Sequence, residues 1–347
     1  MRRTPAVLVA CLLSGLSAIA TSLPAAAAPA ASLAGLACDS FFDPLLVALG
    51  ADCAGSRARE CPTVEGWSAR AAARQPVACE GVVQEAQRLK AAQVDSGYLA
   101  LRPARGRPSA VYLLLHWHEA NAVEAVNYLH LNELARSRGA LVIVPDVPGD
   151  TWAQYTDRNI GRHVAWVDAV LADAQRRYGM GTKPVYLAGL SNGASMAMHY
   201  ACSRADRIDA VMPVALPMHH DDLAACRFSR PIGYVQVHGT RDYLVPYRGT
   251  PWMAGVEKIY GQVSQRLACS GERGAELASA RTPVQLRHAE RCAQGRGSYL
   301  VRVEDGGHTW PDMETLSGSD RNPYGQIARN FDATLQGYDL LQLAAGR

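Results

Sequence analysis

The sequence has little net charge, no cysteine pairs of the C-x-x-C type and no internal repeat. The formal net charge of the 347-residue chain is +3, so the chain offers no basic surface to nucleic acid or to an anionic membrane. Without C-x-x-C pairs, the usual pattern of a structural zinc site is missing. Solenoids and coiled coils are excluded because neither repeats nor heptads occur. The composition is therefore that of an ordinary globular protein.

The one long apolar run, residues 6–20, follows Met1-Arg2-Arg3 and precedes a stretch of small residues at 25–31. This order predicts a secretory signal peptide, which is too short and wrongly flanked for a lasting membrane span. We expect it to cover residues 1–28, so that the mature protein is secreted, either extracellular or periplasmic. Residues 29–95 then form a cysteine-rich N-terminal extension, and residues 96–347 form one large domain.

The cysteine count agrees with export. Of the 9 cysteines, Cys11 leaves with the signal peptide, so an even number remains. An even number in an oxidising compartment predicts disulfides. Proximity along the chain favours Cys202 with Cys226 and Cys269 with Cys292. Two further bridges, of open connectivity, are expected among the four cysteines of the extension, which are Cys38, Cys53, Cys61 and Cys79.

From residue 96 onward, apolar strand patterns alternate with helix patterns. This alternation predicts an α/β fold with a mainly parallel central sheet and helices on both faces. The extension is expected to be helical and stapled by disulfides, with residues 84–90 continuing a helix that begins near Cys79. The expected strands are 97–101, 110–115, 140–144, 184–190, 210–215, 232–237 and 299–303, and the expected helices are 121–138, 161–177 and 325–343.

The strand at 184–190 leads into the most informative stretch of the chain. Residues 189–193 read Gly-Leu-Ser-Asn-Gly and match the G-x-S-x-G nucleophile elbow, which holds a serine in a strained turn above a sheet. A glycine-flanked helix start with a capping serine would give the same letters. As the nucleophile, Ser191 requires a histidine and an acid from elsewhere, and the backbone N–H of Asn192 would face a developing oxyanion.

Two other strands end in suitable residues. Residues 232–237 run into a loop that holds Asp242, and residues 299–303 run into Gly306-Gly307-His308. Catalytic groups of open α/β sheets lie at the carboxyl ends of the strands. We therefore predict that His308 accepts the proton of Ser191 and that Asp242 orients His308. Asp305 is a rival for the role of the acid.

Three motifs carry a resemblance to a known family. Gly-Leu-Ser-Asn-Gly at 189–193, His-Gly-Thr-x-Asp-x-x-Val-Pro-Tyr at 238–247 and Gly-Gly-His-Thr-Trp-Pro at 306–311 together resemble the secreted polyhydroxybutyrate depolymerase and feruloyl esterase family of α/β-hydrolases. The resemblance covers residue 97 to the end of the chain. It implies an α/β-hydrolase fold, the triad Ser191, Asp242 and His308, acyl-enzyme chemistry, no cofactor, and the two disulfides already favoured by proximity.

One segment departs from the family pattern. The family has His-Gly and a small residue after the first core strand, where this chain has His116-Trp117-His118. Position matching makes the backbone N–H of His118 the second oxyanion donor, with Trp117 as a wall for the substrate or as a packing residue. His116-x-His118 also suggests a metal site, but the acid and third histidine of such sites are missing. The cluster at 219–222 is interpreted as a solvated loop, so no metal is expected.

The first prediction for the substrate is an ester, either a polyhydroxyalkanoate-type polyester or its oligomers. Feruloyl or acetyl esters of plant polysaccharide are the first alternative, and amides of a poly(amino acid) are the second, because serine acyl transfer serves all three. A different class is a catalytically inactive hydrolase fold that serves as a binding protein. The sequence predicts no oligomeric state. Aromatic residues expected near the substrate are Trp117, Tyr243, Tyr247, Trp252 and Trp310.

Overall fold

The computed structural model describes residues 59–154, 157–277 and 281–347. The predicted signal peptide and residues 29–58 of the N-terminal extension, with Cys38 and Cys53, lie outside these residues. No helix of the described part is both long and apolar enough to cross a membrane.

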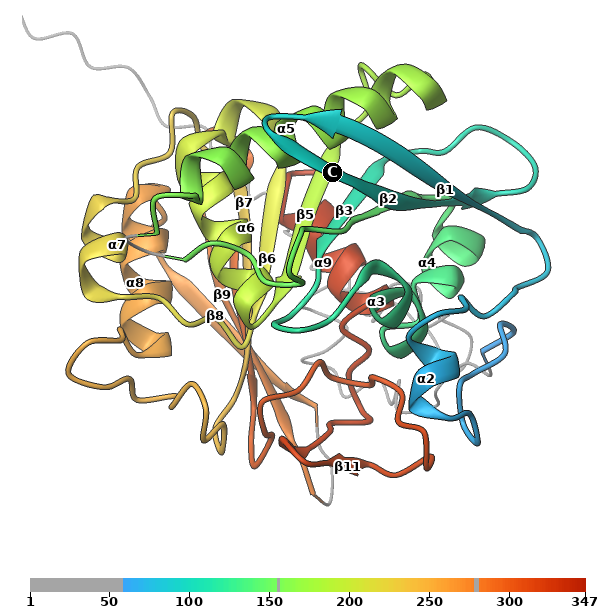
Figure 1. The fold of residues 1–347 in the computed structure, drawn as a ribbon. Coiled ribbons are helices and arrows are strands. Elements are labelled where there is room, and N and C mark those ends of the chain that lie inside the picture. Colours follow the sequence, from blue (N-terminus) through green and yellow to red (C-terminus); the bar gives the residue numbers. More distant parts are fainter. Residues whose placement is uncertain (1–58, 155–156, 278–280) are drawn as a thin grey trace, which may run out of the picture. The chain divides into compact units, whose positions relative to one another are not determined.

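A single ten-stranded sheet forms the centre of the described chain (Figure 1), in the order β1-β2-β4-β3-β5-β6-β7-β10-β9-β8. The inner strands from β4 to β10 are parallel, and an antiparallel pair of strands closes each edge. The strands are β1 Val82–Ala91, β2 Val94–Pro103, β3 Val111–Leu115, β4 Leu141–Pro145, β5 Val185–Leu190, β6 Ala210–Val214, β7 Gly233–Gly239, β8 Glu272–Leu277, β9 Val284–Ala289 and β10 Ser298–Val303. A separate short pair consists of β11 Arg321–Asn322 and β12 Gly325–Gln326.

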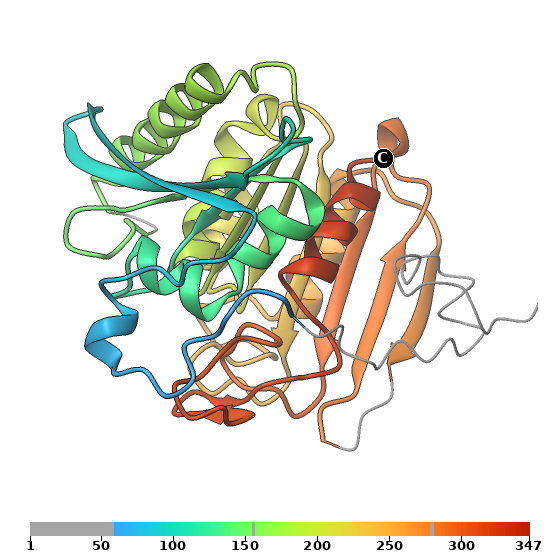
Figure 2. The same ribbon diagram turned by 90° about the vertical axis from the view of Figure 1, so that its right-hand side faces the viewer.

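Helices cover both faces of this sheet, as Figure 2 shows. All five residues of β3 are buried, and they alternate between two cores. Leu113 packs in the core that includes α5, α6 and α8, whereas Leu114 packs in the core that includes α3, α4 and α9. The helices are α2 Ala69–Ala72, α3 Ala122–Tyr128, α4 Leu131–Arg138, α5 Ile160–Tyr178, α6 Asn192–Ser203, α7 His220–Ala225, α8 Val256–Arg266 and α9 Leu335–Ala344. The predicted α/β class with a mainly parallel sheet is thus confirmed.

The predicted helix across residues 84–90 is wrong, because these residues belong to β1. Along β1 the exposed side chains of Ala86, Arg88 and Lys90 alternate with partly buried ones, which is the period of a strand. The turn to β2 is formed by Ala92 and Gln93, both with positive φ. Tight hairpin turns of this kind usually carry Asn-Gly or Gly, so Ala-Gln at this turn does not indicate a hairpin. The expected domain boundary at 95/96 accordingly falls inside β2.

Two predicted helices are shorter than expected. The helix expected at 121–138 is broken at His130, whose φ of 53° is left-handed, while Gly139 ends α4 as predicted. The helix expected at 325–343 begins only at Leu335. The carboxylate of Asp332 accepts hydrogen bonds from the backbone N–H groups of Thr334 (2.8 Å) and Leu335 (2.9 Å) and so caps the start of α9.

Three disulfides lie in the described residues. Cys202 is bonded to Cys226 and Cys269 to Cys292, as predicted from their proximity. In the extension, Cys61 is bonded to Cys79. The remaining pair of extension cysteines is outside the described residues.

Candidate active site

Ser191 lies between β5 and α6 with φ of 55° and ψ of −115°. A non-glycine residue with positive φ is sterically disfavoured and persists only where the surroundings hold it. Here the backbone N–H of Ser191 donates to Val214 O at 2.9 Å. A Cβ on Gly193 would lie 2.1 Å from Leu115 O, so only glycine lets α6 approach β3 this closely. The local sequence therefore folds as the predicted elbow.

His308 follows β10 and hydrogen-bonds to Ser191 and Asp242. Its Nε2 lies 2.8 Å from Ser191 Oγ, and its Nδ1 lies 2.7 Å from Asp242 Oδ2. Because a carboxylate only accepts hydrogen bonds, Nδ1 carries the proton and Nε2 accepts from the serine hydroxyl. The close backbone approach depends on Gly307, where a Cβ would lie 2.4 Å from Tyr324 O. This arrangement has the hydrogen-bond pattern of a Ser-His-Asp triad.

Asp242 is 4% exposed and lies in the loop after β7. Its Oδ1 accepts hydrogen bonds from the backbone N–H groups of Leu244 (3.0 Å) and Val245 (2.8 Å). Burial alone would raise the pKa of Asp242, but hydrogen bonds from His238 and His308 outweigh it and hold the pKa below its ordinary value. The carboxylate is therefore fixed in position and ionised.

A second histidine, His238, also contacts this carboxylate, although no motif in the sequence predicted a role for it. His238 Nε2 lies 3.3 Å from Asp242 Oδ2 and 2.9 Å from Val245 O, so this nitrogen is a donor. The rival acid is elsewhere: Asp305 forms an exposed ion pair with Arg241 at 2.6 Å. Of the two carboxylates, it is Asp242 that hydrogen-bonds to His308.

Asn192 has a function in its side chain that the sequence did not reveal. Its amide accepts from Trp152 N at 2.7 Å and donates to Trp152 O at 3.0 Å. This pair of bonds fastens the loop after β4 to the first residue of α6. As the first residue of the helix, Asn192 has a backbone N–H without an intrahelical acceptor, which leaves it free for an anion.

The peptide between Trp117 and His118 is held by its carbonyl group. Trp117 O lies 2.9 Å from His116 Nδ1 and 3.3 Å from Ala120 N. In a trans peptide the C=O and the following N–H point in opposite directions, so these bonds also fix the direction of the His118 N–H. Burial lowers the pKa of His116 to about 4, which keeps its ring neutral.

The two histidines of this segment have separate surroundings. The side chain of His118 is 59% exposed, and its Nδ1 lies 3.0 Å from Thr151 Oγ1. His116 is fully buried beside Trp152. At 219–222, His220 contacts Thr250 O and Lys258. Across 59–154, 157–277 and 281–347, no group of three or more His, Cys, Asp or Glu side chains could hold a metal ion.

A cavity of about 610 Å³ opens over Ser191 and His308. Aromatic and aliphatic side chains dominate its wall, with carboxylates at Glu119, Glu124 and Glu314 and a guanidinium at Arg321. Burial raises the pKa of Glu124. The apolar side chains that line it are Trp117, Tyr128, Leu190, Leu244, Met313, Leu316, Pro323 and Tyr324.

Of the aromatic residues expected near the substrate, Trp117 lines this cavity. The prediction for Trp310 is wrong, because this side chain is 1% exposed and donates to Thr334 Oγ1 at 3.0 Å in the core. Tyr243 and Trp252 are exposed and are not part of the cavity wall. Tyr247 packs on His238 and donates to Glu257. The tyrosines that do line the cavity, Tyr128 and Tyr324, were missed.

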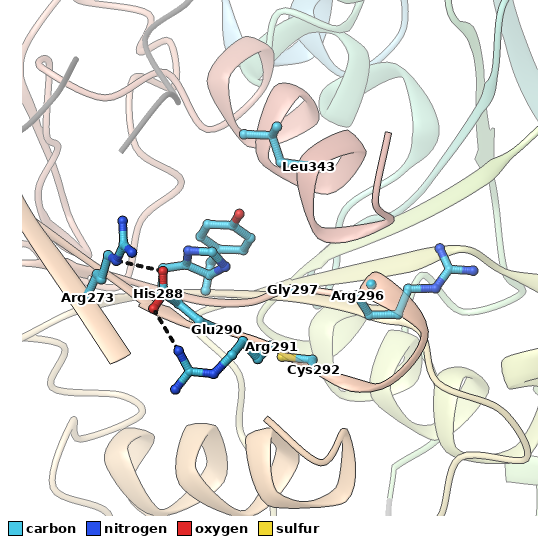
Figure 3. A pocket seen from close by; sticks show the side chains of 10 residues that line it. Arg273, His288, Glu290, Arg291, Cys292, Arg296, Gly297 and Leu343 are labelled. Atoms are coloured by element: carbon cyan, nitrogen blue, oxygen red, sulfur yellow. Dashed lines mark ion pairs between the residues drawn. The ribbon is translucent and has the colours of Figure 1, made fainter. Parts of the chain in front are cut away.

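A second cavity, of about 370 Å³, lies near the start of β10 and the end of α9 (Figure 3). Its guanidinium groups point away from one another in Figure 3. Glu290 lies 2.7 Å from Arg273 and 4.0 Å from Arg291, while His288 stacks on Tyr299 at 4.2 Å. No serine, threonine or free cysteine lines this cavity, since Cys292 is in a disulfide. The cavity over Ser191 is therefore the candidate active site.

Comparison with known proteins gives partial matches to esterases. The bifunctional acetylxylan esterase/xylanase of Neocallimastix patriciarum is 29% identical over 147 residues, which cover 42% of this chain and 21% of that protein. Feruloyl esterase D of Neurospora crassa is 27% identical over 135 residues, or 39% of this chain and 44% of that protein. Feruloyl esterase C of Emericella nidulans is 25% identical over 191 residues, which cover 54% of this chain and 66% of that protein. The chain thus spans less than half the length of the first two relatives.

Among solved structures, an acetyl xylan esterase from Aspergillus awamori has a TM-score of 0.49 and 12% identity, with coverage of 65% of this chain and 94% of its own. No family model matches the sequence.

The sheet and the strand, turn and helix around Ser191 define an α/β-hydrolase. Within that class, the chain is related to feruloyl and acetylxylan esterases. This confirms the feruloyl esterase part of the resemblance, while the polyhydroxybutyrate depolymerase part stays a prediction.

The lowered pKa of Asp242 predicts a pH-dependent contribution to stability. A carboxyl group with a lowered folded-state pKa stabilises the fold above its unfolded pKa, about 4, and loses this contribution as the pH falls. The gap in unfolding free energy between wild type and Asp242→Asn should therefore shrink between about pH 5 and pH 3. Urea denaturation over this pH series measures the gap. A difference in unfolding free energy that stays constant over this pH range would contradict the lowered pKa of Asp242 in the folded state.

Proposed function

We propose that this protein is a carboxylic ester hydrolase that acts through an acyl-enzyme intermediate on Ser191. The observation that carries this proposal is the unbroken hydrogen-bonded series from Ser191 through His308 to Asp242 beside a large cavity. His308 takes the hydroxyl proton as Ser191 Oγ attacks the ester carbonyl, and returns it to the departing alcohol. Water then attacks the acyl-enzyme while His308 accepts its proton, and His308 returns this proton to Ser191 Oγ as the bond from Oγ to the acyl group breaks and the acid leaves. Asp242 stabilises the imidazolium in both halves.

The oxyanion of each tetrahedral intermediate needs donors fixed in advance. We assign this role to the backbone N–H groups of Asn192 and His118. Asn192 offers the free N–H of a helix start, where the helix dipole favours negative charge. His118 offers an N–H whose direction is fixed by the bonds to Trp117 O. His116 is then a positioning residue, and the chemistry requires no cofactor.

For the acyl group we propose an uncharged, bulky acid. The aromatic wall of Trp117, Tyr128 and Tyr324 suits a flat ring, and two of the relatives are named feruloyl esterases. A feruloyl-type ester on a polysaccharide is therefore the first substrate to test. Polyhydroxyalkanoate oligomers are the second, because the motifs at 189–193, 238–247 and 306–311 resemble those of the depolymerases.

We further propose that the protein works outside the cytoplasm. The N-terminal pattern of a signal peptide supports export. Three disulfides support it independently, because such bonds persist in oxidising compartments.

The proposed mechanism is tested by labelling with a fluorophosphonate and by hydrolysis of methyl ferulate, p-nitrophenyl butyrate and amorphous polyhydroxybutyrate. Wild type should label and hydrolyse at least one ester, whereas Ser191→Ala should do neither and retain at most a residual rate roughly 10⁵-fold lower. Ser195→Ala, which changes a buried serine one turn along α6, is the matched control. Wild type that neither labels nor hydrolyses any of these substrates would favour a binding protein instead.

The oxyanion assignment predicts different effects for two neighbouring histidines. Because His118 acts through its backbone, His118→Ala should keep kcat within about threefold. His116→Phe removes the donor to Trp117 O and should lower kcat by about 10- to 100-fold through a misdirected His118 N–H. The two kcat values for p-nitrophenyl butyrate check this, and an equal loss in both variants would refute the backbone role.

Because carboxylates line the cavity, we expect the site to prefer uncharged acyl groups over negatively charged ones. Glu119 and Glu124 should repel a negative acyl group, so kcat/KM for an aryl butyrate should exceed that for the aryl succinate monoester by about tenfold or more. The double variant Glu119→Gln/Glu124→Gln should narrow this ratio. Glu80→Gln, an exposed position outside the cavity wall, is the control and should leave it unchanged. A ratio near one for wild type would contradict the prediction.

A further inference from the structure

The stapled segment 59–79 contacts two elements that line the candidate active site. It includes α2 and is closed by the disulfide between Cys61 and Cys79. Figures 1 and 2 show this blue segment beside α3 and beside the red-orange loop that carries β11. These two elements supply separate parts of the cavity wall, Glu124 and Tyr128 from α3, and 313–317 from the loop.

The contact with α3 runs through one buried amide. Asn127 is 4% exposed, accepts from Val77 N at 2.8 Å and donates to Ala72 O at 2.7 Å and Gln75 O at 2.9 Å. The next residue in the chain is Tyr128, whose ring packs against the small apolar cluster of Val64, Ala72 and Val77. The segment thus fixes the end of α3 that forms the wall.

The contact with the loop has a backbone part and an apolar part. Gly66 N donates to Leu316 O at 2.9 Å. The side chain of Leu316 packs against the same apolar cluster as Tyr128 does. Both residues also line the cavity, so one cluster outside the cavity supports two of its wall residues.

Arg59 joins three carboxylates of the loop region. It pairs with Asp312, with Glu314 at 3.1 Å and with Asp332 at 3.6 Å, and its Nη2 also donates to Asp312 O at 3.1 Å. The arginine side chain is 18% exposed and that of Glu314 is 11% exposed. His130, at the start of α4, contacts the same Oε1 atom of Glu314 at 3.0 Å. Without the guanidinium of Arg59, only Arg329, 3.3 Å from Asp312, and His130 would remain beside the three carboxylates. Their mutual repulsion in low-dielectric surroundings would then be less compensated.

We propose that segment 59–79 is a clamp that sets the width of the active-site cavity, with Arg59 as its positioning residue. The inference rests on the proposed hydrolase function for its kinetic consequence, but the clamp itself is a statement about the loop at 312–318. A clamp of this kind governs the binding of a bulky acyl group and leaves the reaction at Ser191 unaltered. It gives the N-terminal extension a role in substrate selection.

The test compares Arg59→Met with Arg74→Met, an exposed arginine of the same segment. Hydrogen exchange should be about tenfold or more faster at 312–318 in Arg59→Met and unchanged in β5, with no change at either place in Arg74→Met. The KM for methyl ferulate should rise about five- to tenfold, while kcat and the KM for p-nitrophenyl acetate stay within about twofold. Should Arg59→Met fail to fold, Arg59→Lys carries the same test, because an ammonium has its donors on one nitrogen and cannot reproduce the fork by which Nη1 and Nη2 of Arg59 reach Glu314 and Asp312.

Hydrogen exchange tests the clamp, and the kinetic measurements test the proposed hydrolase function, so the two proposals can fail independently. Unchanged exchange at 312–318 overturns the clamp whatever the kinetics show. Faster exchange with an unchanged KM for methyl ferulate overturns its role in substrate binding. If wild type hydrolyses no ester and takes no fluorophosphonate label, the proposed function fails, and the exchange experiment still decides whether the clamp exists.

Discussion

The hydrogen bond between His308 and Asp242 spans 66 residues of sequence and connects the loops after two parallel strands, β10 and β7. Parallel strands end at one edge of the sheet, so each loop that leaves this edge is a neighbour of the others. Ser191 reaches the same edge from β5, two strands away from β7. The order of the strands therefore decides which three residues can meet. The strained φ of Ser191 is held by the hydrogen bond from its backbone N–H to Val214 O of β6, and the glycine at 193 lets α6 lie against Leu115 O of β3.

The sequence predicted the parts of the fold whose reason is local. Strands buried on both faces are continuous apolar runs, and β3, β4, β5 and β6 are buried along their whole length. The edge strand β1 was not predicted as a strand, because the residues that alternate along it include polar ones such as Gln84 and Arg88. The break in the helix at His130 was not predicted, because the groups that His130 contacts, Glu314 and Asp312 O, are about 180 residues away in sequence. Long-range contacts of this kind override local propensity.

Within the candidate site, too, features with a local cause were predictable from the sequence and features that depend on long-range contacts were not. Ser191, His308 and Asp242 were predictable because each follows a strand that the pattern identifies. His238 and the side chain of Asn192 were not, since each acts through a contact that only the folded chain creates. Trp310 shows the opposite error: it is two residues from His308 in sequence, yet its side chain points into the core toward Thr334. Closeness in sequence to a reactive group says nothing about the direction of a side chain in a loop.

Substrate choice depends on residues of a different kind from those that perform the reaction. Acyl transfer needs three groups within hydrogen-bond distance, and this requirement fixes residue types that can be read as motifs. A cavity wall needs only volume, polarity and rigidity, which many residue types supply. Here much of the wall comes from α3 and from 313–324, and segment 59–79 packs against both; none of these segments carries a motif. Since loops cost conformational entropy to order, a wall made of them requires support from outside. The Asn127 amide and the Arg59 guanidinium provide contacts of this kind at two points, so the proposed ester hydrolase would select its acyl group partly through residues that do not touch that group.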